Sequence, residues 1–266
     1  MAGSLGSLEV NKVMCFSPHP DDSEIMAGGT LARWASEGVE VILCVVTNGA
    51  CGSNDPDVDR ADLIATRQRE QRNAAVILGA SEVIFLGHED GFVEDSHELR
   101  KDIIREIRRH KPDVVIGPDP SLYYFQQWYV NHPDHRRVGE AFLAAVNPGV
   151  TTVPLYREEL YDKGFEPHSV KACMLLASPS SDYFVDIGDF IHTKIAALDA
   201  HASQRETWTD SGMAVKGIGS AMAALGGGSY EYAEAFKTLF FGPETGASPF
   251  PDTVGAASGS AADGQV

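Results

Sequence analysis

Buried strands and helices alternate along the first part of the chain. Continuous apolar runs, typical of parallel strands that are buried on both faces, cover residues 12–17, 39–46, 83–86 and 113–117. Between them, apolar positions at helical spacing predict helices over 24–37, 60–78, 96–110 and 132–146. This alternation predicts an α/β fold: a Rossmann-like, doubly wound, mostly parallel sheet with helices on both faces.

The strand order of such a sheet decides which loops meet. In the commonest doubly wound order the first and fourth strands are neighbours, and ligands bind between their carboxyl ends. Two similar polar segments follow these two strands. The first is Ser17–Glu24 (SPHPDDSE) and the second is Asn131–Arg136 (NHPDHR). We therefore expect the two segments to lie together at one edge of the sheet.

The pattern becomes irregular after Pro148. Shorter strands are expected over 155–161, 172–176 and 183–187, and helices over 189–201, 211–225 and 230–239. The sequence predicts a single domain over 11–242, in which a smaller irregular α+β portion, 150–242, shapes the cleft. Residues 1–10 and the Gly/Ala/Ser/Pro-rich residues 243–266 are expected to be flexible.

Composition narrows the classes of partner. The formal net charge of the 266 residues is −17, which argues against nucleic acid and anionic membranes, since both need Lys and Arg clusters. The apolar runs have the length of strands, which predicts no membrane insertion. The first residues lack the pattern of a signal peptide, and the four cysteines form no Cys-x-x-Cys pair. Together these features favour a cytoplasmic protein.

The two polar segments have the chemistry of a metal site. Imidazole nitrogen and carboxylate oxygen are good ligands for Zn²⁺, and a tight turn into a helix would aim His19 and Asp22 at one point. The third ligand is His132 or His135, a choice that spacing leaves open. Three protein ligands leave a position for water, and Asp21 is then the natural base to take its proton.

Two other interpretations compete with a metal site. His19 and the two aspartates after it could simply cap a helix, but a second His-Pro-Asp at another predicted strand end favours a metal site. A Rossmann protein that binds a nucleotide or methyl donor would need Gly-x-Gly-x-x-Gly after the first strand. Here Gly28 and Gly29 lie inside the predicted helix instead.

The motifs resemble those of the PIG-L/LmbE-like zinc deacetylases, which remove the N-acetyl group from N-acetylglucosamine-type sugars. The resemblance covers about residues 12–205. Its motifs are His19-Pro20-Asp21-Asp22-Ser23-Glu24 with Gly28-Gly29-Thr30, then Arg67, Glu70, Ala74, Leu78 and Gly79, then Leu86-Gly87 with Asp90-Gly91, then His132-Pro133-Asp134-His135, and finally His201-Ala202-Ser203-Gln204.

The resemblance implies a role for each motif residue. The zinc ligands would be His19, Asp22 and His135. Asp21 would be the general base, and His132 would stabilise the oxyanion or protonate the leaving amine.

Four further residues would support this chemistry. Asp134 would hydrogen-bond a histidine, and we expect Glu24 to brace the turn. Arg67 and Asp90 would hold sugar hydroxyls, or, in the case of Arg67, a charged substituent.

The resemblance also implies the reaction and its partners. The expected enzyme is a zinc-dependent amide hydrolase that releases acetate and a primary amine from a small N-acetylated sugar or glycoconjugate. It is also expected to form a homo-oligomer, either a trimer or a hexamer. The alternative is a metal-binding member without activity. Some members place a tyrosine two residues before the last motif, where this chain has Val130, so no role is given to Tyr129. The aromatic stretch 123–129 walls the cleft or packs beneath its loop.

Overall fold

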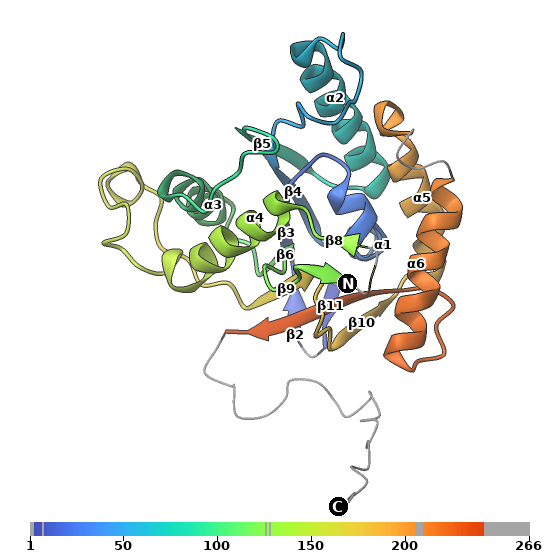
Figure 1. Ribbon diagram of the computed structural model, residues 1–266. Coiled ribbons are helices and arrows are strands. Elements are labelled where there is room, and N and C mark those ends of the chain that lie inside the picture. Colours follow the sequence, from blue (N-terminus) through green and yellow to red (C-terminus); the bar gives the residue numbers. More distant parts are fainter. Residues whose placement is uncertain (1–2, 7, 126, 128, 206–209, 242–266) are drawn as a thin grey trace, which may run out of the picture.

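The computed structural model describes residues 3–6, 8–125, 127, 129–205 and 210–241. A seven-stranded sheet runs through the middle of the molecule (Figure 1). Its order is β10 (Tyr183–Asp186), β11 (Ala233–Phe240), β9 (Ala172–Leu176), β6 (Val114–Pro118), β3 (Lys12–Ser17), β4 (Glu40–Thr47) and β5 (Glu82–His88). The strands from β9 to β5 are parallel, and β11 is antiparallel to both of its neighbours.

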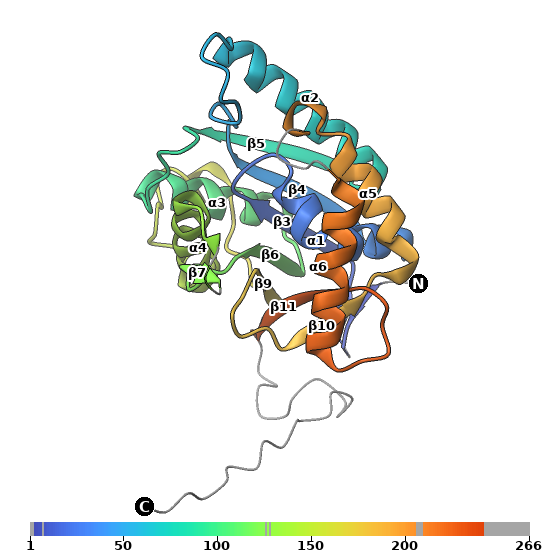
Figure 2. The same cartoon turned by 45° about the vertical axis from the view of Figure 1, so that its right-hand side comes forward.

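Helices cover both faces of this sheet (Figure 2). The first face carries α1 (Asp22–Ser36), α2 (Arg60–Leu78), α5 (Ile191–Asp199) and α6 (Ser211–Gly226), and the second carries α3 (His97–His110) and α4 (Pro133–Ala144). Successive side chains of a strand point to opposite faces. Accordingly, Val13 and Cys15 of β3 join the core under α1, and Met14 and Phe16 join the core under α3 and α4. The predicted fold class and the predicted pairing of the first and fourth strands are confirmed.

The predicted helix over 230–239 is wrong, because this segment is β11. Ala, Glu and Lys favour a helix in isolation, but β11 occupies the slot between β9 and β10. In that slot Phe236 packs into the core, and the neighbouring Lys237 forms an ion pair with Asp182. Strand pairing and burial therefore outweigh the local helix propensity.

Three smaller expectations also need correction. The expected strand over 155–161 consists of turns, ending in a 3₁₀ turn over Tyr161–Lys163. The expected helix over 189–201 is divided into a 3₁₀ turn, Gly188–Phe190, and α5. Gly3–Leu5 (β1) and Leu8–Val10 (β2) pair as a hairpin whose Leu5 and Val10 are buried, although the sequence predicts a flexible start.

A second short hairpin lies in the loop before α4. Its strands, Tyr124–Phe125 (β7) and Tyr129–Val130 (β8), are antiparallel. The predicted flexible tail, 243–266, lies outside the described residues. Among the helices of the described part, none is long and apolar enough to cross a membrane.

The buried ion pair of Glu234 and Lys194 ties the last strand to α5, and hydrogen bonds to Glu234 tie the same strand to the first helix. The Glu234 carboxylate on β11 accepts hydrogen bonds from the backbone N–H groups of Gly29 (2.9 Å) and Thr30 (2.7 Å) in α1. Lys194 Nζ of α5 donates to the same carboxylate at 2.6 Å, and only 3% of each side chain is exposed. Glu234 thus joins β11, α1 and α5 at one point behind the carboxyl edge of the sheet.

Replacing one partner of this pair should destabilise the fold strongly. Lys194→Met leaves a buried carboxylate without its cation, a change that typically costs about 3–5 kcal/mol. The measurement is the free energy of unfolding from urea titration. As a control, Arg137→Gln breaks the surface pair with Glu140 and should cost about 1 kcal/mol or less. Equal losses in the two variants would show that the buried pair holds the fold no more strongly than a surface pair does.

Candidate metal centre and active site

The two His-Pro-Asp motifs meet at the carboxyl edge of β3 and β6. The first motif forms the turn between β3 and α1, and the second begins α4. Gly139 lets α4 approach the end of β6 closely, because a Cβ at this position would lie 2.7 Å from the carbonyl oxygen of Pro118. The neighbouring strands and this close approach bring His19 and His135 to a ring-centroid distance of 5.3 Å.

His19, Asp22 and His135 form a compact donor set. Asp22 Oδ2 lies 3.2 Å from His19 Nδ1 and 3.2 Å from His135 Nε2, and all three ligand atoms lie within 4.8 Å of one another. A tetrahedral ion with bonds of about 2.0–2.1 Å would separate its ligand atoms by about 3.3 Å. The donor atoms therefore have the chemistry and the spacing that a Zn²⁺ ion requires.

The other edge of the His19 ring faces two more carboxylates. His19 Nε2 lies 3.2 Å from Asp134 Oδ2 and 3.2 Å from Asp90 Oδ1. The backbone N–H of Gly91 donates to Asp134 at 2.8 Å. Burial alone would lower the pKa of His19, but its hydrogen bonds to the surrounding aspartates hold that pKa well above its usual value. This surplus of buried negative charge also suits a cation.

A second possible donor set shares His19 with His132 and Asp134. His132 is the N-cap of α4, where its Nδ1 accepts the backbone N–H of Asp134 at 3.2 Å. A neutral His132 therefore carries its proton on Nε2. His132 is exposed as a residue, but partial burial of its ring, followed by the charge of His19, lowers its pKa. His132 is thus placed to donate a hydrogen bond to a bound molecule.

Asp21 sits in a strained turn that α2 braces. Its φ of 98° is left-handed, a conformation that costs a non-glycine residue energy and persists only when neighbours enforce it. The backbone N–H of Asp21 donates to Gln71 Oε1 at 3.0 Å, and Gln71 Nε2 donates to Glu24 Oε1 at 2.8 Å. Burial, followed by the charge of Asp22, raises the pKa of Asp21 to about 7 although Arg67 opposes this.

Arg67 and Asp90 lie beneath the turn, each with less than a tenth of its surface exposed. Arg67 donates to the carbonyl oxygens of Pro20 (2.8 Å) and Gly49 (3.1 Å) and to Asp21 Oδ2 (3.3 Å). Asp90 accepts the backbone N–H of Cys51 at 2.8 Å in addition to its contact with His19. Both residues are therefore engaged with the protein itself, and their expected contact with sugar hydroxyls stays a prediction.

Gln71 braces Asp21, although no sequence motif predicts a role for it. It lies one helical turn after Arg67, and residues four apart share a helix face, which is the signal that could have found it. The same helix reaches the segment that follows α5, since Glu70 accepts the backbone N–H of Ser203 at 2.9 Å. Buried there, His201 Nε2 lies 3.6 Å from Glu24 Oε2. Glu24 therefore lies between Gln71 and His201, consistent with the expected bracing of the turn.

Two tyrosines of the aromatic stretch lie on the outside of the loop. Tyr123 and Tyr124 are more than half exposed, and the Arg136 guanidinium lies 4.8 Å from the Tyr123 ring centre. The Tyr129 hydroxyl donates to Asn131 Oδ1 at 3.2 Å. Residues 126 and 128 of this stretch lie outside the described residues. Tyr123 and Tyr124 are thus accessible and do not pack beneath the loop.

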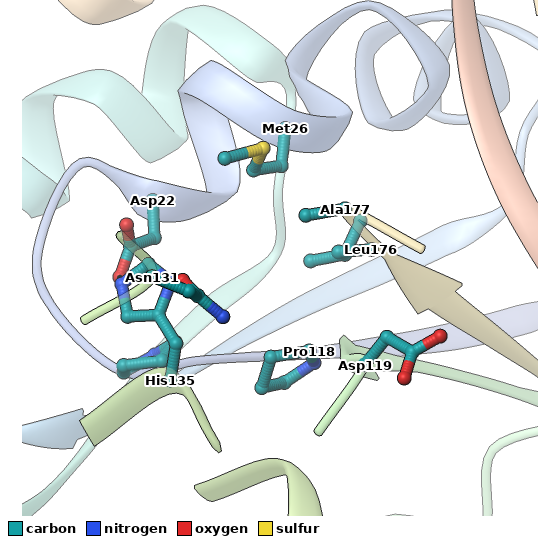
Figure 3. A pocket seen from close by; sticks show the side chains of 9 residues that line it. Asp22, Met26, Pro118, Asp119, Asn131, His135, Leu176 and Ala177 are labelled. Atoms are coloured by element: carbon teal, nitrogen blue, oxygen red, sulfur yellow. The ribbon is translucent and has the colours of Figure 1, made fainter. Parts of the chain in front are cut away.

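A small pocket opens beside the donor set (Figure 3). It lies over the carboxyl ends of β3, β6 and β9, with Asp22 and His135 on one side. A doubly wound fold with two imidazoles and a carboxylate at its switch point is typical of hydrolases that use a metal ion.

Comparison with known proteins identifies the family. The family model described as PIG-L, GlcNAc-PI de-N-acetylase, matches residues 14–146. The chain is 34% identical over 196 residues to a diacetylchitobiose deacetylase of Thermococcus kodakarensis, covering 74% of this chain and 71% of that protein. A 1D-myo-inositol 2-acetamido-2-deoxy-alpha-D-glucopyranoside deacetylase of Actinosynnema mirum is 29% identical, with 82% and 87% covered.

A comparison with solved structures supports the same family. N,N'-diacetylchitobiose deacetylase from Pyrococcus horikoshii superimposes with a TM-score of 0.79 at 31% identity, covering 86% of this chain and 84% of that one. The chain belongs to the PIG-L family. The expected resemblance is thus confirmed, and with it the class of enzyme, an N-deacetylase.

Removing the brace on Asp21 should cost stability. Gln71→Leu leaves the buried N–H of Asp21 and one oxygen of Glu24 without their partner, a loss of about 1–3 kcal/mol for an unsatisfied buried group. The check is the unfolding free energy of the protein. Gln68→Leu, on the same helix but half-exposed, is the control and should change stability little. A fully stable Gln71→Leu variant would show that the turn is held by other contacts.

Proposed function

We propose that this protein is a metal-dependent deacetylase that hydrolyses the acetamide of an N-acetylglucosamine-type sugar, with Zn²⁺ as its metal. The observation that carries the proposal is the donor set of His19, Asp22 and His135 beside the buried carboxylate of Asp21. The names of the relatives support the substrate class, since they describe deacetylases of diacetylchitobiose and of an inositol-linked acetamido sugar.

The metal would be held by His19 Nδ1, Asp22 Oδ2 and His135 Nε2. When bound, such an ion supplies Lewis-acid activation of the acyl carbonyl and of the attacking water. Asp134 would orient His19 from behind, because a ligating histidine usually donates its other ring N–H to a carboxylate. The 3.2 Å contact between Asp134 Oδ2 and His19 Nε2 supports this role.

Asp21 would act as the general base. Its carboxylate lies in a turn that Gln71 and Arg67 brace, so it is oriented before substrate arrives. Arg67 Nη2 lies 3.3 Å from Asp21 Oδ2, which leaves Asp21 Oδ1 to accept a proton from water. A positioned base of this kind typically contributes about 10²–10⁴-fold to the rate.

His132 would act on the acyl oxygen or the leaving nitrogen, whereas Asp21 acts on the water. Its Nε2–H, fixed by the hydrogen bond that Nδ1 accepts, would stabilise the oxyanion or protonate the leaving nitrogen. In the overall reaction, the water oxygen forms a bond to the acyl carbon and one water proton passes to Asp21. The carbon–nitrogen bond then breaks, the nitrogen gains a proton, and acetate and a primary amine leave.

Arg67 and Asp90 support the turn from within the protein, and their contact with sugar hydroxyls remains a prediction. The acceptor sugar would also meet the exposed Tyr123 and Tyr124 at the surface, because their rings are able to stack on a pyranose face. The expected homo-oligomer and cytoplasmic location remain predictions. The alternative is a metal-binding member without activity. In that case the zinc-loaded, unmodified protein would release no acetate in the measurements below.

Substitution of the base should separate catalysis from metal binding. Asp21→Asn should retain stoichiometric zinc but lose about 10²–10⁴-fold in acetate release from an acetamido sugar, because only the proton acceptor is removed. Zinc content by mass spectrometry and acetate release are the two measurements. Asp57→Asn, in an exposed loop, is the control and should match the unmodified protein. Full activity of Asp21→Asn would rule out this role.

Substitution of a ligand should affect both properties. His135→Ala should lose bound zinc and activity together, because two protein ligands remain. Zinc content and acetate release are again the measurements. Retention of one zinc per chain in this variant, with loss of zinc in His132→Ala, would move the third ligand to His132.

Removal of the metal should abolish activity reversibly. Treatment with a chelator should stop acetate release from an acetamido sugar, and added Zn²⁺ should restore it. Since an ion that binds only the folded state stabilises it, zinc at a hundred times its dissociation constant should add about 2.7 kcal/mol to the unfolding free energy. Activity that is unaffected by complete chelation would contradict the proposal.

A further inference from the structure

The pocket beside the donor set has an apolar wall. Its lining includes Met26 of α1, Pro118 at the end of β6, and Leu176 and Ala177 at the end of β9. Figure 3 shows these side chains around a hollow, with Asp22 and His135 at its opposite side. The metal ligands therefore form one end of a pocket whose remaining wall is mostly hydrocarbon.

The other polar side chains of the wall are engaged with the protein. Asn131 Nδ2 donates to the Leu122 carbonyl oxygen at 2.8 Å, and Asn131 Oδ1 accepts the Tyr129 hydroxyl. The Asp119 carboxylate accepts hydrogen bonds from Ser121 and Ser178. A sugar hydroxyl entering here would lose its hydrogen bonds to water and find few replacements, whereas an apolar group would lose nothing.

The size of the pocket points the same way. Its enclosed part has room for about one water-sized group, far less than the roughly 300–1,000 Å³ typical of sites that enclose a whole ligand. Leu176 is 3% exposed and closes the end of β9. A single methyl group that extends from the metal ligands fits this space better than a sugar ring does.

We propose that this pocket binds the hydrocarbon end of the acyl group and that Leu176 and Met26 limit the length of the acyl chain. The inference rests on the proposed deacetylase function and adds to it two residues that set the length of the acyl group. Each additional methylene in a hydrophobic pocket of fixed size typically changes discrimination by about 10–200-fold. The enzyme should therefore prefer N-acetyl over N-butyryl glucosamine by at least roughly tenfold in kcat/KM.

The variants enlarge the pocket at two independent positions. Leu176→Ala and the half-buried Met26→Ala should each raise the butyryl-to-acetyl ratio of kcat/KM by roughly tenfold. Leu175→Ala is the matched control, because Leu175 is similarly buried on β9 but belongs to the core on the opposite face of the sheet. It should lose stability like Leu176→Ala and leave the ratio unchanged. Met26→Ala keeps the test informative if Leu176→Ala does not fold.

A binding measurement makes the test independent of turnover. Acetohydroxamate and butyrohydroxamate carry the same metal-binding group and differ in chain length, so their affinities for the zinc-loaded protein, measured by calorimetry, should follow the same order and the same changes. Failure of the protein to bind zinc or to hydrolyse any N-acyl glucosamine would overturn the proposed function. Acetate release together with ratios that neither enlargement alters would overturn the acyl pocket alone.

Discussion

The constraint on which the site depends is the concentration of buried negative charge around one imidazole. Asp22, Asp90 and Asp134 reach His19 from three separate segments, and each is less than a tenth exposed. Buried charges are costly unless they are paired. At the switch point of the sheet, backbone N–H groups, Arg67 and the proposed cation together offset the cost of burying these negative charges. The rest of the architecture keeps these carboxylates together.

Much of this arrangement followed from short-range patterns. The apolar runs of β3, β4 and β6 indicated a parallel sheet, and the ordinary strand order then brought the two His-Pro-Asp segments together before any contact was known. β11 could not be predicted in this way, because its partners β9 and β10 are distant in sequence and its composition favours a helix. Residues 233–240 thus form a strand because they pair with β9 and β10, and not because of their own composition.

The support of the site was harder to predict than its ligands. His19 and Asp22 stand out because their residue types have few other uses at a strand end. Gln71 does not, because an amide on a polar helix is ordinary until the backbone N–H of Asp21 is found beside it. Arg67 illustrates the same limit: its motif suggested contact with substrate but gave no sign of its hydrogen bonds to Pro20 and Asp21 beneath the turn. Which atoms a side chain contacts depends on tertiary geometry that spacing does not contain.

The position of β11 also bears on how the chain acquires its structure during synthesis. β9 and β10 precede it in the chain, yet β10 joins the sheet only through β11. While the ribosome is still making residues 187–232, the edge of β9 has no strand beside it, and such an edge pairs readily with other chains. Glu234 is also made after α1 and α5, so its carboxylate is able to join these two helices only at that late stage. This side of the sheet is therefore able to close only after β11 has been synthesised.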